Sequence, residues 1–236
     1  MNNETKNRGF KFIVFDLDGV LVTPISSWVW VHDHFGVNND DSYERYMRNE
    51  IDDSEFMRSD IALWLSKKKR IHINEIRGIL ASVQLMPGFH DTFKILKFLG
   101  IQVAIVSSGL NPLAERVSAL AGIPPEYVLA NGLETDENGY LTGEGILRVK
   151  LRAKGEPVHQ LMAQLGFSRA ETVAVGNGVT DIPMLKASGL GIAFNPLDDN
   201  VTQNANVVIF EKNLIEILKH ICDVDGLPSH LREKCK

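Results

Sequence analysis

The chain has little cysteine and no long apolar run, and both shortages limit what it can be. Only two of its 236 residues are cysteine, Cys222 and Cys235, and both lie near the C-terminus. They are too few for a disulfide framework, and their spacing is not that of a zinc site. No apolar run approaches the ~20 residues of a membrane span, and residues 1–9 lack the apolar core of a signal peptide. We therefore expect a cytoplasmic protein without membrane contact.

The chain also lacks an excess of basic charge. Its formal net charge is −5, with 25 lysine and arginine residues against 30 aspartate and glutamate residues. Nucleic-acid binding needs a basic face, so we expect no nucleic-acid partner. Small anionic substrates stay compatible with this balance, because a local positive site can lie in an acidic protein. The length permits one large domain, or a core domain with a modest insertion.

Short apolar runs alternate with segments of helical periodicity along most of the chain. Because parallel strands are joined by crossover helices, this alternation predicts an α/β fold with a parallel sheet covered on both faces. The expected strands are 10–15, 101–106, 127–130, 172–175, 190–194 and 206–210, and the expected helices are 89–99, 113–120, 156–165 and 214–221.

Residues 25–84 interrupt this alternation. They contain all three tryptophans and many charges but no convincing strand, which predicts three or four helices inserted as a cap. The expected domains are a core of residues 1–24 and 85–236 and a cap of residues 25–84. Within the core, residues 131–149 carry Asp-Glu-Asn-Gly at their middle and predict a β-hairpin that projects from the sheet.

Polar residues follow several of the predicted strands. Parallel strands end on one edge of a sheet, and ligands bind just beyond that edge. We therefore expect a single site to be built from Asp16, Asp18, Ser107, Ser108, Lys154, Asn177 and Asp181.

Phosphoryl transfer accounts for this set of side chains. It needs a nucleophile, donors that bind phosphate oxygens and a cation that offsets charge. Asp16 is the expected nucleophile, and Asp18 lies close enough to protonate the leaving oxygen and later activate water. The expected phosphate ligands are the Ser107 hydroxyl, N–H groups near Ser108 and the Lys154 ammonium.

Mg²⁺ is the expected cofactor, because it prefers hard oxygen ligands and keeps several waters. Its expected ligands are Asp16, the Asp18 backbone and the loop that follows Gly176. Each signal also has a purely structural interpretation: Asp-Gly is common in turns, Ser-Ser-Gly in loops, and Asp181 suits a helix N-terminus. Four such signals in order, each at a strand end, favour the catalytic interpretation.

Four motifs resemble those of the haloacid dehalogenase superfamily, and most of all its phosphoserine-phosphatase-like branch. They are Phe-Asp-Leu-Asp-Gly-Val-Leu-Val from Phe15, Val-Ser-Ser-Gly from Val106, Ala-Lys-Gly at 153–155 and Val-Gly-Asn-Gly-Val-Thr-Asp-Ile-Pro-Met from Val175. The resemblance extends from about residue 11 to residue 221 and is faint in the cap.

This resemblance implies a Rossmann-like core sandwiched by helices, a small helical cap inserted after the first strand and a β-hairpin flap. It implies Asp16 as nucleophile and Asp18 as acid and base. Ser107 and Lys154 would bind phosphate. Asn177 and Asp181 stand at the two acidic positions of the family's metal motif, so the implied metal residues are Asp16, Asp18, Asn177 and Asp181.

Two departures from the family pattern concern the metal and the substrate. Asn177 replaces an aspartate, and its uncharged amide oxygen should bind a cation more weakly, so that Asp181 coordinates more directly. Phosphoserine phosphatases bind the amine and carboxylate of their substrate with a cap glutamate and a cap arginine. Here Ile25 and Asp60 occupy those positions, and Arg58 is the nearest replacement for the arginine.

The aromatic and histidine residues of the cap have mainly structural interpretations. His32 and His34 are more typical of surface or partly packed side chains than of a metal pair. Trp28, Trp30 and Trp64 are expected to form the cap's own core, with the alternative that one of them faces the substrate pocket.

The sequence thus predicts a Mg²⁺-dependent phosphatase that acts on a small phosphorylated metabolite other than phosphoserine, through an aspartyl-phosphate on Asp16. Two alternatives stay open. The first is a phosphate-binding or regulatory protein with weak catalysis, which Asn177 would explain. The second is a phosphotransferase that passes the phosphoryl group to an acceptor other than water. The sequence leaves the oligomeric state open.

Overall fold

A short apolar strand near the start of the chain forms the middle of the sheet. The computed structural model describes residues 8–235, and in it all four residues of β1 are buried. The sheet has seven strands in the order β4-β3-β2-β1-β5-β6-β7. Only the β3–β4 pair is antiparallel, so the predicted parallel α/β sheet is confirmed. The strands are β1 (Phe12–Phe15), β2 (Gln102–Leu110), β3 (Val128–Thr135), β4 (Leu141–Ile146), β5 (Thr172–Gly176), β6 (Leu190–Phe194) and β7 (Val207–Ile209).

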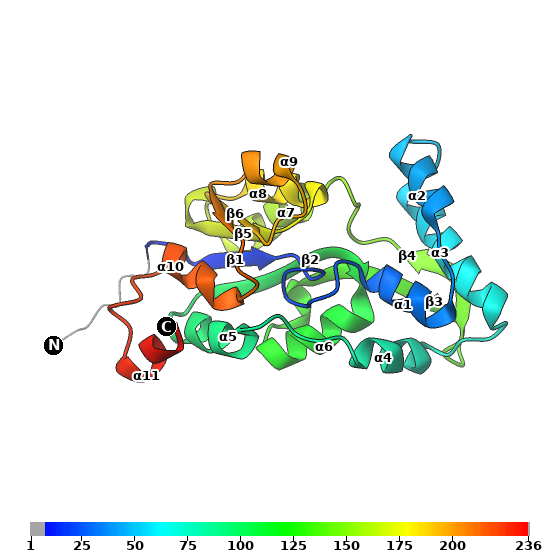
Figure 1. Ribbon diagram of the computed structural model, residues 1–236, viewed down its shortest axis with the longest axis horizontal. Coiled ribbons are helices and arrows are strands. Elements are labelled where there is room, and N and C mark those ends of the chain that lie inside the picture. The colour runs from blue at the N-terminus through cyan, green and yellow to red at the C-terminus, as the bar shows by residue number, and fades with distance from the viewer. Residues whose placement is uncertain (1–7, 236) are drawn as a thin grey trace.

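Alternate side chains of β1 enter two different apolar layers, because successive residues of a strand point to opposite faces. Ile13 and Phe15 pack in the larger layer with α5 (Phe89–Phe98), α6 (Asn111–Ala121) and α10 (Leu218–Ile221). Phe12 and Val14 pack in the smaller layer with α7 (Gly155–Leu165), α8 (Ile182–Ala187) and α9 (Asp199–Gln203). Figure 1 shows α5 and α6 below the sheet and α7 to α9 above it. A last short helix, α11 (Ser229–Arg232), lies beside α5 at the C-terminal end.

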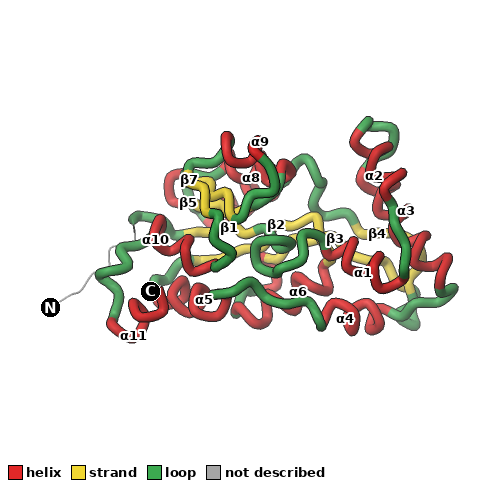
Figure 2. Tube along the Cα trace, in the orientation of Figure 1, coloured by secondary structure: helices red, strands yellow, loops and turns green. Residues whose placement is uncertain are grey.

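The segment between β1 and α5 is helical, as predicted (Figure 2). It contains α1 (Ser27–Phe35), α2 (Asp40–Met47), α3 (Asp53–Lys67) and α4 (Ile73–Ala81). The segment that leaves the core lies beside the segment that returns to it, and the two are joined by an isolated β-bridge between Val22 and Leu85. The apolar residues of the insertion do not form a separate core, however. Trp64 and its neighbours join the same cluster as Phe15, so the proposed boundary between core and cap stays a prediction.

Three elements differ from the prediction by more than one or two residues at an end. β2 does not stop at Val106 but continues to Leu110, and its register with β3 shifts over that stretch. The hairpin begins earlier than predicted, because β3 is itself a strand of the main sheet. The final predicted helix starts as a tighter turn over Leu214–Ile217. No helix within residues 8–235 is long and apolar enough to cross a membrane.

The packing of β1 predicts the effect of truncating Phe12. Its side chain is fully buried and stacks on Phe167 with ring centroids 5.4 Å apart. Phe12→Ala should therefore lower the free energy of unfolding by about 3–5 kcal/mol. Phe98→Ala is the matched control, because Phe98 is 49% exposed on α5. Urea denaturation of both variants measures the difference, and equal losses would contradict the assigned packing.

Candidate active site

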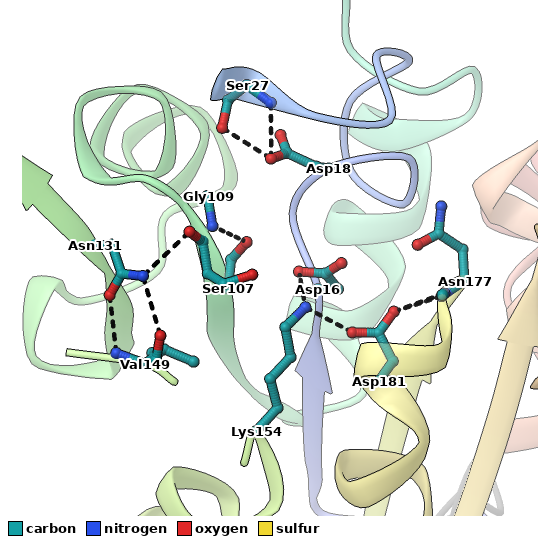
Figure 3. A network of polar contacts seen from close by, with 12 residues as sticks. Asp16, Asp18, Ser27, Ser107, Gly109, Asn131, Val149, Lys154, Asn177 and Asp181 are labelled. Carbon is teal, nitrogen blue, oxygen red and sulfur yellow. Dashed lines mark hydrogen bonds and ion pairs between the residues drawn. The ribbon is translucent and has the colours of Figure 1, made fainter. Parts of the chain in front are cut away.

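The residues that the sequence singled out do meet at the carboxyl ends of the central strands (Figure 3). Asp16 and Asp18 follow β1, Asn177 follows β5, and Lys154 lies immediately before α7. Lys154 reaches the cluster from the start of a helix because Gly155 packs tightly there. A Cβ atom on Gly155 would lie 2.8 Å from the backbone oxygen of Pro183.

Lys154 is the centre of the cluster. Its ammonium lies 2.9 Å from Asp16 Oδ1 and 2.6 Å from Asp181 Oδ1, and all three side chains are almost completely buried. Burial alone would lower the pKa of Lys154, but the two carboxylates outweigh burial and raise that pKa above its usual value. The ammonium therefore stays charged and holds Asp16 in place.

Asp181 binds both the loop after β5 and the ammonium of Lys154. Its Oδ2 accepts hydrogen bonds from the backbone N–H groups of Asn177 at 2.8 Å and Gly178 at 2.9 Å, while Oδ1 accepts from Lys154. The loop turns so closely over Asp181 that a Cβ atom on Gly176 would lie 2.4 Å from Asp181 Cβ. Both carboxylate oxygens of Asp181 are thus engaged within the protein.

Asp18 is held by a residue that the sequence did not identify. Its Oδ2 accepts hydrogen bonds from the Ser27 backbone N–H at 2.9 Å and from the Ser27 hydroxyl at 2.8 Å. The same hydroxyl accepts a hydrogen bond from the Leu110 N–H at 2.9 Å. The Ser-Ser pair before α1 signals only a helix cap, and Ser26 does cap α1 by accepting from Val29. The cap accounts for Ser26, and no pattern in the sequence connects Ser27 with Asp18.

Ser107 and Ser108 lie inside β2 rather than in a loop after it. The register shift between Val106 and Leu110 resembles a β-bulge, a feature that re-aims side chains beside active sites. Ser107 is buried, and its hydroxyl accepts a hydrogen bond from the Gly109 N–H at 3.1 Å. Ser107 and Ser108 both line the same cavity as Asp16.

Asn131 is a second residue of the site that the sequence did not identify, because the sequence placed it only in the hairpin. Its side-chain amide donates to the carbonyl oxygens of Ser108 at 3.2 Å and Val149 at 3.0 Å. Its Oδ1 accepts from the backbone N–H groups of Arg148 and Val149, both at 2.9 Å. Asn131 therefore ties the chain that leaves the hairpin to the bulged part of β2, as Figure 3 shows.

Asp16 and Asp18, which follow β1, both have raised pKa values. Burial, reinforced by repulsion from Asp181 and only partly offset by Lys154, raises the pKa of Asp16 to about 7. Burial also raises the pKa of Asp18, against the opposing effect of the Ser27 hydrogen bonds. Perturbed carboxylates in a cavity are typical of catalytic sites.

Two buried carboxylate oxygens in this cluster fit a bound cation. Asp16 Oδ1 and Asp18 Oδ1 are buried without a hydrogen bond to the described part of the chain, although Lys154 forms an ion pair with Asp16. Asn177 Nδ2 is also buried and unpaired, but it is a donor, so only the Oδ1 atom of that amide could bind a cation. Within residues 8–235 no three His, Cys, Asp or Glu side chains gather as a metal site. In the expected set of metal residues, Asn177 stands where a further carboxylate would be. A carboxylate, an amide oxygen and backbone carbonyls still form the few hard oxygen ligands that Mg²⁺ needs.

A cavity of about 720 Å³ opens from this cluster towards α1, α2 and α3. Trp28 lines it and donates its indole N–H to the Ser108 carbonyl at 3.1 Å, so one tryptophan does face the pocket. Trp64 instead is fully buried and stacks on Trp28 with ring centroids 5.5 Å apart. The volume lies in the range of small-molecule sites.

His32 and His34 do not form a metal pair. His32 is buried, and its Nδ1 accepts a hydrogen bond from Trp64 Nε1 at 2.6 Å. The other ring nitrogen lies 2.9 Å from Asp60 Oδ1. His34 is exposed. Arg58 does not enter the cavity either, because its Nε donates to Glu144 on β4 at 2.8 and 3.0 Å.

Comparisons with known proteins agree with this geometry. A family model described as haloacid dehalogenase-like hydrolase matches residues 10–189. A phosphoserine phosphatase of Archaeoglobus fulgidus is 31% identical over 236 residues, which cover 98% of this chain and 64% of that protein. A phosphoserine phosphatase of Methanocaldococcus jannaschii is 30% identical and matches 89% of this chain and 97% of its own length. The chain thus spans less than two thirds of the first relative and nearly all of the second.

A solved structure has the same fold. It is a phospho-aspartyl intermediate analogue of phosphoserine phosphatase, with a TM-score of 0.75 and 29% sequence identity. The match covers 90% of this chain and 99% of that one. These similarities confirm the predicted superfamily and branch.

The close contact between Gly19 and Asn177 yields a testable prediction. Gly19 has φ +73°, and a Cβ atom there would lie 2.0 Å from Asn177 Nδ2. Gly19→Ala should displace that amide and lower Mg²⁺ affinity by roughly tenfold, because ligand geometry sets affinity for this cation. Titration calorimetry with Mg²⁺ measures the effect.

Gly36→Ala is the matched control for Gly19→Ala. Gly36 has φ +63°, with nothing within 4 Å of an added Cβ atom. Both variants therefore bear the left-handed strain of about 1–2 kcal/mol, but only the first disturbs the site. Equal Mg²⁺ affinities in the two variants would exclude Asn177 from the cation site.

Proposed function

The chain belongs to the haloacid dehalogenase-like hydrolase family, in its phosphoserine-phosphatase-like branch, and we propose that it hydrolyses small phosphomonoesters through an aspartyl-phosphate on Asp16. One observation carries this proposal. The Asp16 carboxylate lies at the base of a cavity, 2.9 Å from a buried ammonium that also contacts Asp181. A carboxylate held in this way can attack a phosphorus atom whose oxygens bind the same ammonium.

In the first half-reaction an Asp16 oxygen forms a bond to phosphorus as the ester bond to the leaving oxygen breaks. Asp18 supplies the proton that this oxygen takes up, and its raised pKa favours the protonated form that can donate. In the second half-reaction Asp18 accepts a proton from water, whose oxygen attacks the aspartyl-phosphate and releases inorganic phosphate. Asp16 is then regenerated as a carboxylate.

The phosphate oxygens would be bound by groups from two other elements. Lys154 would supply a charged donor, and the Ser107 hydroxyl and the Ser108 N–H would supply neutral ones. The N–H groups of Gly109 and Leu110 already donate to serine hydroxyls. Because Lys154 is held by Asp181 and is almost completely buried, it does not reorganise as negative charge develops.

Mg²⁺ would be held by Asp16, the Asp18 backbone carbonyl and the Asn177 amide oxygen, with water completing its shell. It would offset the repulsion between the anionic nucleophile and the anionic substrate. Asp181 was expected to coordinate more directly, but its oxygens already bind Lys154 and two backbone N–H groups. We assign Asp181 to positioning these groups, and its role as a direct ligand stays a prediction.

The uncharged Asn177 favours a second candidate, a phosphate-binding protein with weak catalysis. An amide oxygen binds a hard cation less strongly than a carboxylate does. In that case the chain would bind phosphate analogues but turn over slowly at ordinary Mg²⁺ concentrations. Turnover measured against Mg²⁺ concentration distinguishes the two candidates.

Replacement of the nucleophile gives the most direct test. Asp16→Asn should lower kcat for a generic aryl phosphate by at least about a thousandfold, because the amide cannot form the covalent intermediate. Asp41→Asn, at an exposed position in the first turn of α2, is the control and should retain activity. Phosphate release is measured with Mg²⁺ and with a chelator. Activity that survives in Asp16→Asn would refute the mechanism.

Restoring a carboxylate at the metal position gives a further prediction. Asn177→Asp should lower the Mg²⁺ concentration for half-maximal activity by roughly tenfold, because each added ligand charge strengthens binding of a hard cation. Asn138→Asp adds the same charge at the exposed hairpin turn and should have no such effect. An unchanged Mg²⁺ requirement in Asn177→Asp would show that Asn177 does not face the cation.

A further inference from the structure

The lining of the cavity that contains Asp16 includes many exposed apolar side chains. Ten large hydrophobic side chains are exposed in the described part of the chain, and six of them line this cavity. Monomeric proteins rarely gather exposed apolar side chains in this way unless the patch binds something. The six are Ile25, Val29, Tyr43, Met47, Val179 and Leu197.

These apolar residues come from both sides of the cavity. Ile25 and Val29 belong to the start of the insertion, Tyr43 and Met47 to α2, and Val179 to the loop after β5. Figure 1 shows α2 and α3 on one side of this region and α8 and α9 on the other. The part of a bound substrate beyond its phosphate would therefore contact apolar side chains on both sides of the cavity.

Both cations that line the cavity within residues 8–235 already have partners in the protein. Among residues 8–235, the lysine and arginine side chains that line it are Lys154 and Arg152. Lys154 is held by its two carboxylates. Arg152 is directed to the end of α2, where it donates to Asn49 Oδ1 at 2.5 Å and to the Met47 carbonyl at 3.1 Å. Its guanidinium also lies over the Tyr46 ring, 4.9 Å from the centroid.

The insertion instead contributes negative charge to the cavity. Asp60 lines the cavity and is 4% exposed, and its Oδ1 accepts from Asn39 at 2.5 Å. His32 is also 2.9 Å from that oxygen, and because its Nδ1 accepts from Trp64, its other nitrogen carries the proton and donates to Asp60. The carboxylate is thus fixed at a position where a substrate carboxylate would be repelled.

We propose that the leaving group of the substrate is an alcohol with an apolar carbon skeleton and no anionic group, so that a carboxylate on it is selected against. This inference rests on the proposed phosphatase function. Apolar contact would bind the skeleton, while a carboxylate would lose its hydration, meet only cations that already have partners and face Asp60. A neutral alcohol or an amino alcohol satisfies these conditions.

Matched substrate pairs test the proposal directly. Phosphoethanolamine differs from phosphoserine only by the carboxylate, and phenyl phosphate differs from 4-carboxyphenyl phosphate in the same way. In each pair kcat/KM, measured by phosphate release with Mg²⁺, should be at least about tenfold higher without the carboxylate. Phenyl phosphate should also exceed phosphoethanolamine, because it buries more carbon.

Ile25→Arg makes the test independent of intrinsic substrate reactivity. Ile25 is 63% exposed at the cavity, so arginine can be accommodated there and would supply the missing cation. The variant should lower the discrimination ratio within each pair by about tenfold. Phe98→Arg, at a 49% exposed position on α5, adds the same charge elsewhere and should leave the ratio unchanged.

The outcomes distinguish a failure of the substrate inference from a failure of the proposed phosphatase function. Turnover of aryl phosphate without discrimination against the carboxylate, or equal ratios in Ile25→Arg and Phe98→Arg, would overturn the inference but leave the phosphatase function intact. If no phosphomonoester is hydrolysed at any Mg²⁺ concentration, the proposed function fails, and the inference fails with it. Preference for both uncarboxylated substrates that Ile25→Arg reduces would support the proposal.

Discussion

The ion pairs of one buried ammonium with two buried carboxylates are the constraint on which the site depends. Lys154 lies 2.9 Å from Asp16 and 2.6 Å from Asp181, and removing Lys154 would leave two uncompensated carboxylates in the interior. Two carboxylates and one ammonium also leave one negative charge in excess, and burial with this excess raises the pKa of Asp16 to about 7. The site is therefore built to take up positive charge, from a proton or from a cation.

That constraint requires close backbone approach in two places. Gly155 lets α7 begin against Pro183, since a Cβ atom would lie 2.8 Å from the Pro183 carbonyl oxygen. Gly176 lets the loop after β5 fold over Asp181 and donate two backbone N–H groups to it. Side chains more than 130 residues apart meet here because β1 and β5 are adjacent and parallel, so their carboxyl ends coincide.

Features of the site that follow from strand order could be predicted from the sequence, and features that follow from packing could not. Asp16, Lys154 and Asp181 follow apolar runs or precede a helix, and topology alone brings them together. Ser27 gave no sequence signal for the site, although its hydroxyl binds Asp18. The extension of β2 through Ser107 was missed because serine and glycine disfavour strands, and the bulge that holds them depends on pairing with β3. The partner of Arg58 lies 86 residues away on β4, beyond any local pattern.

The sheet and the insertion do not act separately in this site, because Ser27 at the start of α1 binds Asp18. In the proposed mechanism the sheet would supply the nucleophile and the phosphate-binding groups, while the insertion would surround the leaving group. Ser27 opens the insertion, yet its N–H and hydroxyl both bind Asp18, and its hydroxyl also accepts from Leu110 of β2. Those two hydrogen bonds lower the pKa of Asp18 against burial, which raises it. Because the pKa of Asp18, the proposed acid and base, depends on where α1 begins, the insertion that lines the cavity also affects the proposed chemistry of Asp18.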